Sequence, residues 1–297
     1  MSEHFADRLM AAIKEKGSRI CVGIDPVVER LPCTIGDEGD RIGQVRAFCT
    51  GILRAVADHC AVAKPNSAFF EALGPQGMGL LHDVIGEAKR LGLLVILDAK
   101  RNDIGSTAEA YAKAIFGGGG AVPDAVTVNP YLGSDGVQPF IEAAEACGGG
   151  IFVLVKTSNP SSAQLQDLKV DGKPVYHHVA ELVDDWGSAH VGESGWSSVG
   201  AVVGATWPEQ LVELREAMPR TPFLVPGYGA QGGGAGDVLA AFDEEGLGAV
   251  VNSSRGIIYA IDREPHADRF APDEWERAAA AAAEEMRDTI NEAIDGR

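Results

Sequence analysis

Short apolar runs recur along the whole chain, and each has the length of one buried strand. Between them lie segments with apolar residues spaced by three and four, the period of an amphipathic helix. Strands that are buried on both faces read as continuous apolar runs, so the pattern predicts repeated β–α units. Eight such units fit a closed (β/α)8 TIM barrel better than an open sheet. The predicted strands are "RICVGID" (19–25), "CAVAKPN" (60–66), "LLVILDAK" (93–100), "DAVTVNP" (124–130), "IFVLVKTS" (151–158), "GAVVGAT" (200–206), "PFLVPGYG" (222–229) and "GAVVNSSRG" (248–256).

Two segments interrupt this α/β alternation. The connection after the fifth strand, which includes 158–175 and 187–198, is long and predicts an extra turn or hairpin before its helix. The segment 273–294 is rich in Ala and other strong helix formers, so it predicts a C-terminal helix. Neither feature indicates a second domain. We therefore expect residues 1–297 to form one barrel domain.

The chain is strongly acidic, with 43 Asp and Glu residues against 25 Lys and Arg residues and a formal net charge of −18. Nucleic-acid binding needs a basic face, so we expect no nucleic-acid partner. An acidic surface stays soluble through self-repulsion, which salt screens. We interpret the charge as a hypothesis of adaptation to a salty, halophile-like cytoplasm, with a merely acidic mesophilic protein as the alternative. A melting temperature that rises with KCl would support the hypothesis.

Cysteine usage and the N-terminal sequence bear on the compartment. The five cysteines form no C-x-x-C pair and are odd in number, which is typical of reduced cytosolic thiols. The first sixteen residues are charged and amphipathic, and no run reaches the roughly 18 apolar residues of a membrane span. We therefore expect a cytoplasmic protein without a membrane partner.

Polar residues follow the predicted strands at the end where barrel enzymes hold their active sites. Asp98 and Lys100 lie two positions apart, so on a regular strand both side chains face the barrel mouth. Lys64 ends the neighbouring strand and Asp103 follows Lys100, so the four can form an alternating series of charges. A satisfied charge cluster at a strand exit is the simpler explanation for an isolated D-x-K-x-x-D. Lys64 favours a functional cluster, because it allows the charges of neighbouring strand ends to pair with one another. Charges at the ends of buried strands are costly unless they are paired.

Two loops near the end of the chain predict a phosphate site. "PGYGAQGGG" (226–234) follows the seventh strand and is rich in glycine, while "NSSRG" (252–256) follows the eighth and contains Arg255. Barrel enzymes commonly hold a phosphate with the loops after these two strands. A Gly-rich loop alone is more often a simple turn, but Arg255 adds a guanidinium group whose paired N–H donors fit the oxygens of a phosphate. The pair of loops therefore predicts a phosphorylated substrate.

Other candidate chemistry is weaker. His177 and His178 are adjacent and cannot share a metal on a regular helix, so we interpret them as surface or packing residues. No G-x-S-x-G nucleophile elbow occurs in the sequence. Lys156, on the fifth strand, would serve as a Schiff-base lysine only if it were desolvated enough to lose its proton.

The sequences at the strand ends, taken in their order along the chain, resemble those of one known family. "DAKRNDI" (98–104) resembles the D-x-K-x-x-D signature of orotidine 5'-phosphate decarboxylases. The segments "KPNSAFFE" (64–71), "NPYLGSDG" (129–136), "VKTSNPSS" (155–162), "PGYGAQGG" (226–233) and "NSSRGIIYA" (252–260) are similar, in the same order, to the longer "type 2" branch of that family. The resemblance implies a cofactor-free and metal-free carboxy-lyase of pyrimidine biosynthesis. Its expected reaction converts orotidine 5'-phosphate to uridine 5'-phosphate and CO2.

The resemblance also implies a role for each matching residue. Lys100 is expected to protonate C6 of the pyrimidine within a network that contains Lys64, Asp98 and Asp103. Asp103 and Thr107 are expected to reach into the site of a neighbouring subunit, which implies a homodimer. The expected substrate contacts are Asp25 for the ribose, Ser158 for the pyrimidine, and Gln231 with Arg255 for the phosphate.

Three alternatives remain open at the level of sequence. The nearest is a magnesium-dependent sugar-phosphate decarboxylase or synthase, because the D-x-K-x-x-D block is shared with such barrels. A second is a Schiff-base aldolase that uses Lys156 or Lys64. The third, from a different class, is a catalytically silent barrel that binds uridine 5'-phosphate without decarboxylating its precursor.

Overall fold

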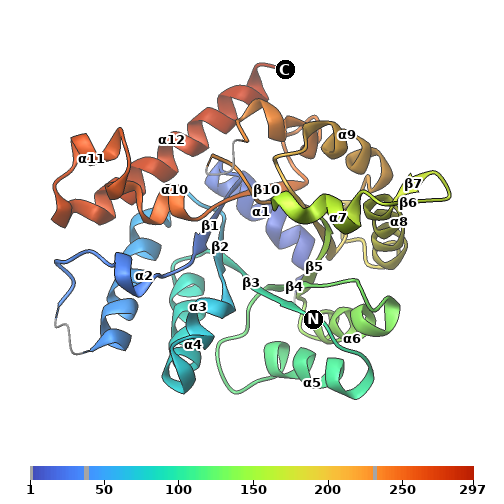
Figure 1. Ribbon diagram of the computed structural model, residues 1–297, viewed down its shortest axis with the longest axis horizontal. Coiled ribbons are helices and arrows are strands. Elements are labelled where there is room, and N and C mark those ends of the chain that lie inside the picture. Colours follow the sequence, from blue (N-terminus) through green and yellow to red (C-terminus); the bar gives the residue numbers. More distant parts are fainter. Residues whose placement is uncertain (1–2, 37–39, 230–232) are drawn as a thin grey trace.

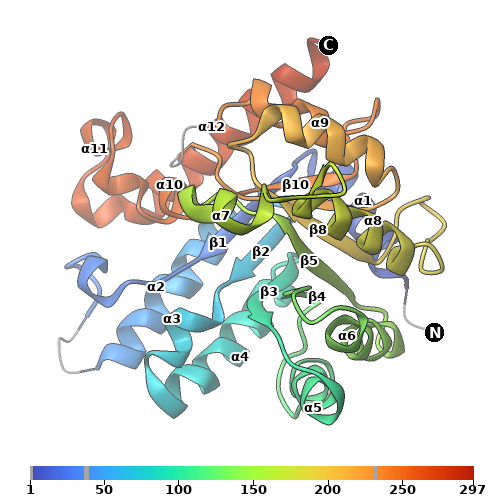
Figure 2. The same ribbon diagram turned by 45° about the vertical axis from the view of Figure 1, so that its right-hand side comes forward.

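Eight parallel strands close into a barrel. Figure 1 and Figure 2 show how strands and helices are arranged around it. The computed structural model describes residues 3–36, 40–229 and 233–297. Around the barrel the order is β1-β10-β9-β8-β5-β4-β3-β2, so neighbours in the chain are neighbours in the barrel. The predicted (β/α)8 fold is confirmed, and each predicted apolar run contains one strand. The strands are β1 (Ile20–Ile24), β2 (Val62–Pro65), β3 (Leu94–Arg101), β4 (Ala125–Val128), β5 (Gly150–Lys156), β8 (Val199–Val203), β9 (Phe223–Val225) and β10 (Ala249–Ser253).

Helices surround the barrel (Figure 1). The predicted additions are both present. A two-stranded hairpin, β6 (Lys169–Val170) and β7 (Lys173–Pro174), precedes the helix of the long fifth connection, and the C-terminal segment is one long helix. The helices are α1 (Phe5–Lys16), α2 (Arg41–Val56), α3 (Ser67–Glu71), α4 (Gly74–Arg90), α5 (Gly105–Phe116), α6 (Ser134–Ala146), α7 (Ala163–Gln166), α8 (Val175–Gly187), α9 (Pro208–Ala217), α10 (Arg255–Ile258), α11 (His266–Arg269) and α12 (Trp275–Asp295).

The interior of the barrel is packed with apolar side chains at its N-terminal end. Cys21, Ile96 and other inward-facing strand residues form one cluster with the apolar face of α1. Phe5 of α1 meets Phe152 of β5 edge to face, with ring centroids 6.0 Å apart. Burial of each such side chain stabilises the fold by about 1.5–3 kcal/mol. Because α1 packs across this end, a ligand can enter the described part of the barrel from the opposite, C-terminal end.

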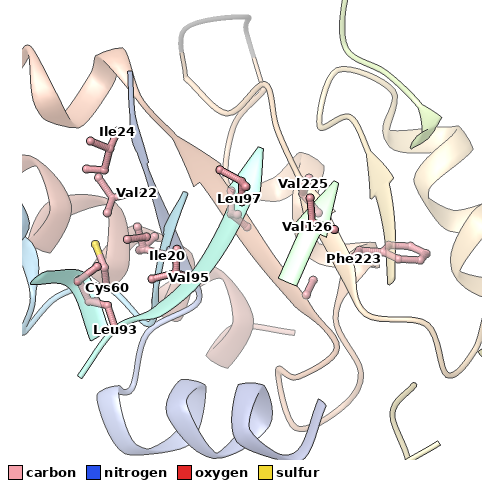
Figure 3. Packing of buried hydrophobic residues seen from close by; sticks show 14 of the residues in the cluster. Ile20, Val22, Ile24, Cys60, Leu93, Val95, Leu97, Val126, Phe223 and Val225 are labelled. Carbon is pink, nitrogen blue, oxygen red and sulfur yellow. The ribbon is translucent and has the colours of Figure 1, made fainter. Parts of the chain in front are cut away.

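A second apolar layer lies between the strands and the outer helices. Figure 3 shows part of it, with Ile20, Val22 and Ile24 of β1 pointing the same way. Successive side chains on a strand point to opposite faces, so these residues alternate with inward-facing Cys21. Burial on both faces explains why the strands read as continuous apolar runs in the sequence.

The alternation breaks at two strand ends. The register between β3 and β4 shifts between Leu97 and Arg101, and Lys100 has a left-handed backbone with φ of +45°. The register between β5 and β8 shifts between Leu154 and Lys156. A register shift of this kind redirects the side chains beyond it. These two irregularities decide where the strand-end lysines point.

Within the described residues, no helix combines the length and the apolar character needed to cross a bilayer.

Three of the five cysteines are part of the core. Cys21, Cys49 and Cys60 are buried, whereas Cys33 and Cys147 are exposed. Burial raises the pKa of Cys21 to about 12, which keeps this thiol protonated at neutral pH.

Candidate active site

A cavity of about 500 Å³ opens at the C-terminal ends of the strands. This is the end of a (β/α)8 barrel at which active sites are built. Strands on all sides of the barrel contribute to its wall, together with the loop that follows β5. The lining residues are Asp25, Lys64, Asn66, Asp98, Lys100, Thr127, Leu154, Thr157, Ser158, Asn159, Gln166, Val202, Leu224, Pro226, Asn252 and Ser254.

Two lysines and one aspartate meet at the floor of this cavity. Lys64 Nζ of β2 donates to Asp98 Oδ2 at 2.8 Å, and Lys100 Nζ of β3 donates to Asp98 Oδ1 at 2.5 Å. The side chains of Lys64 and Asp98 are only 6% and 8% exposed, whereas that of Lys100 is 47% exposed. The carboxylate therefore bridges one buried ammonium and one ammonium that is open to the cavity.

Burial and charge act in opposite directions on these groups. Burial disfavours the charged form of Asp98, but the two lysines outweigh it and hold the pKa of Asp98 far below its usual range. Burial likewise opposes the charge on Lys64, but Asp98 and Asp25 together hold the pKa of Lys64 above its usual value. Near neutral pH the floor therefore holds an ionised Asp98 and a charged Lys64.

Thr127 belongs to the same cluster, although it was not among the predicted site residues. Its hydroxyl donates to Asp98 Oδ1 at 2.9 Å and accepts from the backbone N–H of Lys100 at 3.0 Å. The side chain faces the interior of the barrel from β4 and is 1% exposed as a residue. A threonine within an apolar strand is also typical of ordinary β structure, so the sequence carries little signal for its role.

The opposite half of the floor is apolar. Leu154 of β5, Val202 of β8 and Leu224 of β9 line the cavity there. The floor of the cavity thus combines a charged half with an apolar half.

The loop after β5 passes close to the end of β8. Gly204 follows β8, and a Cβ at this position would lie 3.0 Å from the backbone nitrogen of Ser158. A glycine is therefore needed for the loop after β5 to approach β8.

The loop after β5 forms one wall of the cavity and carries the predicted Ser158. Gln166 of α7 anchors this loop, because its side chain accepts from the backbone N–H of Thr157 at 3.0 Å and donates to Thr157 Oγ1 at 2.7 Å. Trp207 Nε1 donates to the carbonyl of Thr157 at 3.2 Å. Ser158 lines the cavity as predicted, whereas Gln166, which lies within the long connection predicted after the fifth strand, was not among the predicted site residues.

Lys156 points away from the cavity, contrary to its proposed role as a Schiff-base lysine. The register shift after Leu154 turns it outward, and the side chain is fully buried. Its ammonium pairs with Asp167 and lies 4.9 Å from the ring centroid of Trp207 and 5.3 Å from that of Tyr176. A carbonyl substrate in the cavity cannot reach it, so the geometry excludes the Lys156 aldolase.

Two polar side chains at the cavity wall have oxygen atoms without a partner among the described residues. These atoms are Oδ1 of Asp25, which follows β1, and Oδ1 of Asn252 in β10. Both residues line the cavity. Buried polar atoms are usually hydrogen-bonded, so both oxygens are available to polar groups of a bound ligand. Asp25 was predicted as a ligand contact, whereas Asn252 was not.

The remaining predicted residues lie elsewhere. Asp103 is outside the cavity, where its Oδ1 accepts from the backbone N–H of Ile104 at 2.9 Å, so it does not join the predicted charge series within one chain. Thr107 is exposed on the first turn of α5. Arg255 is exposed and begins α10, next to Ser254 of the cavity wall. Gln231 lies outside the described residues.

The adjacent histidines agree with their interpretation as surface or packing residues. His177 and His178 lie on α8 beside Glu181, outside the cavity. Among the residues that the structure describes, no three His, Cys, Asp or Glu side chains are grouped so as to hold a metal ion.

Comparisons with known proteins agree with this geometry. Residues 18–270 match the model of the orotidine 5'-phosphate decarboxylase / HUMPS family. The chain is 51% identical to an orotidine 5'-phosphate decarboxylase from Rhodopirellula baltica, over 96% of this chain and 98% of the relative. It is 40% identical to one from Caldicellulosiruptor bescii, over 98% and 99%.

A solved structure gives the same result at the level of the fold. The structure of Leishmania donovani OMP decarboxylase superposes with a TM-score of 0.78 at 34% sequence identity, covering 98% of this chain and 99% of that one. The family match, the sequence identity over nearly the full length of the relatives and the barrel geometry all indicate the same family. The chain therefore belongs to the orotidine 5'-phosphate decarboxylase / HUMPS family.

Proposed function

We propose that this protein decarboxylates orotidine 5'-phosphate to uridine 5'-phosphate and CO2, as a cytoplasmic enzyme of de novo pyrimidine biosynthesis. The observation that carries the proposal is the pair of ammonium groups that share Asp98 at the cavity floor. Full-length relatives at 40–51% identity are named for this activity, which supports the same substrate.

The proposed reaction needs a cation beside C6 of the pyrimidine. The bond between C6 and the carboxylate breaks, CO2 leaves, and the electron pair stays on C6. The Lys100 ammonium stabilises this developing negative charge and then transfers a proton to C6. The neutral amine regains a proton from water, to which the half-exposed Lys100 side chain has access. One proton is consumed for each CO2 released.

The neighbouring groups hold Lys100 in place for this step. Asp98 accepts from Lys100 on one oxygen and from Lys64 on the other, so the ammonium is positioned before substrate binds. Preorganised charge of this kind avoids reorganisation during the reaction, and it acts most strongly where water is excluded. The apolar half of the floor, with Leu154 and Val202, contributes this exclusion.

We assign the remaining contacts by position in the cavity and by family resemblance. Asp25 binds the ribose hydroxyls, which its unpartnered oxygen supports. Ser158 binds the pyrimidine from the loop after β5. Arg255, at the start of α10, and Gln231 bind the phosphate. Binding energy from the distant phosphate can then be used to lower the barrier at the reacting carbon.

We propose a homodimer in which Asp103 and Thr107 complete the partner's site. Both lie outside the cavity of their own chain, near the start of α5. Exposed apolar side chains accompany them: Ile104 is 51% exposed and Tyr131, after β4, is 73% exposed. Large exposed apolar side chains near a functional site are typical of a surface that a protein partner covers.

Mixing two inactive variants tests this shared site. In a mixed dimer of Lys100→Ala and Asp103→Ala chains, one site has an intact Lys100 and receives an intact Asp103. Half of randomly formed dimers are mixed and one of their two sites is intact, so about a quarter of the wild-type rate returns. Recovery requires denaturation and co-refolding, or co-expression, of the two chains. No recovery in co-expressed dimers would contradict the assignment of Asp103 to the partner's site.

The activity itself is tested by following the loss of orotate absorbance with wild-type protein in low and high salt. We expect turnover that EDTA does not reduce. EDTA-sensitive turnover of a sugar phosphate would instead favour the magnesium-dependent alternative. Binding of uridine 5'-phosphate without any decarboxylation would favour a silent barrel.

The geometry gives a physical reason against the magnesium alternative. Both oxygens of Asp98 accept from ammonium groups, and these cations would repel a divalent ion at the same carboxylate. Relatives at 40–51% identity over nearly their whole length carry the name of the cofactor-free candidate instead. A remaining aldolase would need Lys64, whose raised pKa keeps it charged and non-nucleophilic at neutral pH.

A further inference from the structure

A single hydroxyl connects the backbone of Lys100 to the carboxylate of Asp98. Thr127 Oγ1 lies 3.0 Å from the Lys100 amide nitrogen and 2.9 Å from Asp98 Oδ1. A backbone amide can only donate, so the Thr127 oxygen accepts there and its own proton points to Asp98. The direction of both hydrogen bonds therefore follows from the chemistry of the groups.

These contacts close a ring around Lys100. Its ammonium donates to the same Asp98 oxygen at 2.5 Å, so Lys100 is held at its backbone through Thr127 and at its tip through Asp98. The backbone between these contacts is left-handed, with φ of +45°, a conformation that a residue with a long side chain adopts only when surrounding contacts enforce it. The register shift at the end of β3 removes regular ladder support at this point. Thr127 supplies a replacement.

We propose that Thr127 is a positioning residue for the proton donor: its hydroxyl holds Lys100 in the left-handed turn and orients Asp98, which together aim the Lys100 ammonium at the reacting carbon. This inference rests on the proposed function, in which Lys100 delivers the proton. Thr127 lies 1% exposed on the neighbouring strand, so its position is fixed by the barrel and does not depend on a mobile loop. It acts through Lys100 and needs no contact with the substrate.

The test compares substitutions that separate the hydroxyl from the packing. Thr127→Val keeps the shape and removes both hydrogen bonds, whereas Thr127→Ser keeps the hydroxyl and removes a methyl group. The matched control is Thr221→Val, because Thr221 is also 1% exposed but precedes β9 at the sealed end of the barrel. If Thr127→Val does not fold, Thr127→Ala takes its place beside the same serine variant.

We expect kcat of Thr127→Val to fall about 100-fold, because a displaced catalytic group costs roughly this factor, with KM changed less than about threefold. Thr127→Ser should recover most of the lost rate, and Thr221→Val should match the wild type. The inference fails if Thr127→Val keeps the wild-type kcat, if only KM changes, or if serine does not recover activity. Absence of wild-type decarboxylation would instead refute the proposed function.

A crystal structure of Thr127→Val gives a readout that does not depend on activity. We expect Lys100 to leave the left-handed region and its ammonium to move away from Asp98 Oδ1. An unchanged Lys100 backbone and an unchanged contact with Asp98 would overturn the positioning role, whatever the kinetics show.

Discussion

The ends of β3 and β5 each carry a lysine beside a register shift, yet the two lysines have opposite surroundings. Lys100 is 47% exposed, enters the cavity and pairs with Asp98 on its own strand. Lys156 is fully buried, points away from the cavity and pairs with Asp167 from the insertion after β5. Aromatic rings lie beside the Lys156 ammonium, whereas a second lysine shares the partner of Lys100.

The difference in surroundings separates the lysine that we propose to be reactive from the one that we propose to be structural. Both are charged groups at strand ends, so residue type and position do not distinguish them. Access does: the Lys100 ammonium can approach a ligand and exchange protons with water, and the Lys156 ammonium cannot. Lys156 instead anchors the insertion that carries Gln166, and through it the loop with Ser158. One strand end is proposed to perform chemistry and the other to hold the wall of the cavity.

Removing the carboxylate partner of each lysine should produce the largest contrast. Asp98→Asn removes the carboxylate that pairs directly with the buried Lys64, so we expect a loss of about 3–5 kcal/mol in the free energy of unfolding. Decarboxylation should fall at least about 10³-fold, because the ammonium groups lose their common partner. Asp167→Asn, the matched variant, should cost about 1–3 kcal/mol, since the aromatic rings still contact Lys156.

Urea denaturation and initial rates of the two variants measure this contrast. Most of kcat should survive in Asp167→Asn, because Asp167 is proposed to act on the cavity wall and not on the reacting atoms. Equal losses of kcat in the two variants would show that the β5 pair also takes part in the chemistry. The contrast between the two lysines would then be wrong.

A smaller effect is expected in the pH dependence of stability. The pKa of Asp98 is lowered in the folded state. Its contribution to the free energy of unfolding is therefore present above the pKa of about 3.9 that it has in the unfolded state, and is lost as pH falls below that value. The folded pKa of Lys64 is raised, so its contribution is present below about 10.4 and is lost as pH rises further.

The stability difference between wild type and Asp98→Asn should therefore be largest between about pH 5 and 9 and should shrink as pH falls below about 4. Urea denaturation of both proteins across this range is the measurement. A difference that stays constant down to about pH 2 would mean that Asp98 does not stabilise the fold through its charge.

Much of this fold could be predicted because the barrel imposes a strong pattern. Strands buried on both faces read as apolar runs, and all eight were found. The convergence of Lys64, Asp98 and Lys100 was also predictable, because parallel strands place their C-terminal ends together. Asp25 and Ser158 reach the cavity as the family resemblance implied.

The rest depends on features that leave little trace in the sequence. A register shift turned Lys156 outward, and strict alternation cannot anticipate such a shift. Thr127 resembles any strand threonine until its two hydrogen bonds are seen. Gln166 comes from an insertion whose path is set by tertiary contacts with Thr157. The roles that we propose for Asp103 and Thr107 require a second chain, and no pattern within one chain describes such a contact.

We propose that the lysine at the end of β3, and not the one at the end of β5, delivers the proton. Methionine removes the charge of either residue and keeps much of its length, so the direct measurement is the decarboxylation rate of Lys100→Met and Lys156→Met, each first shown to be folded. We predict that Lys100→Met loses at least about 10³-fold in kcat, whereas Lys156→Met stays within about fivefold of wild type. A Lys100→Met enzyme that retains the wild-type rate, or a greater loss in Lys156→Met, would contradict the account.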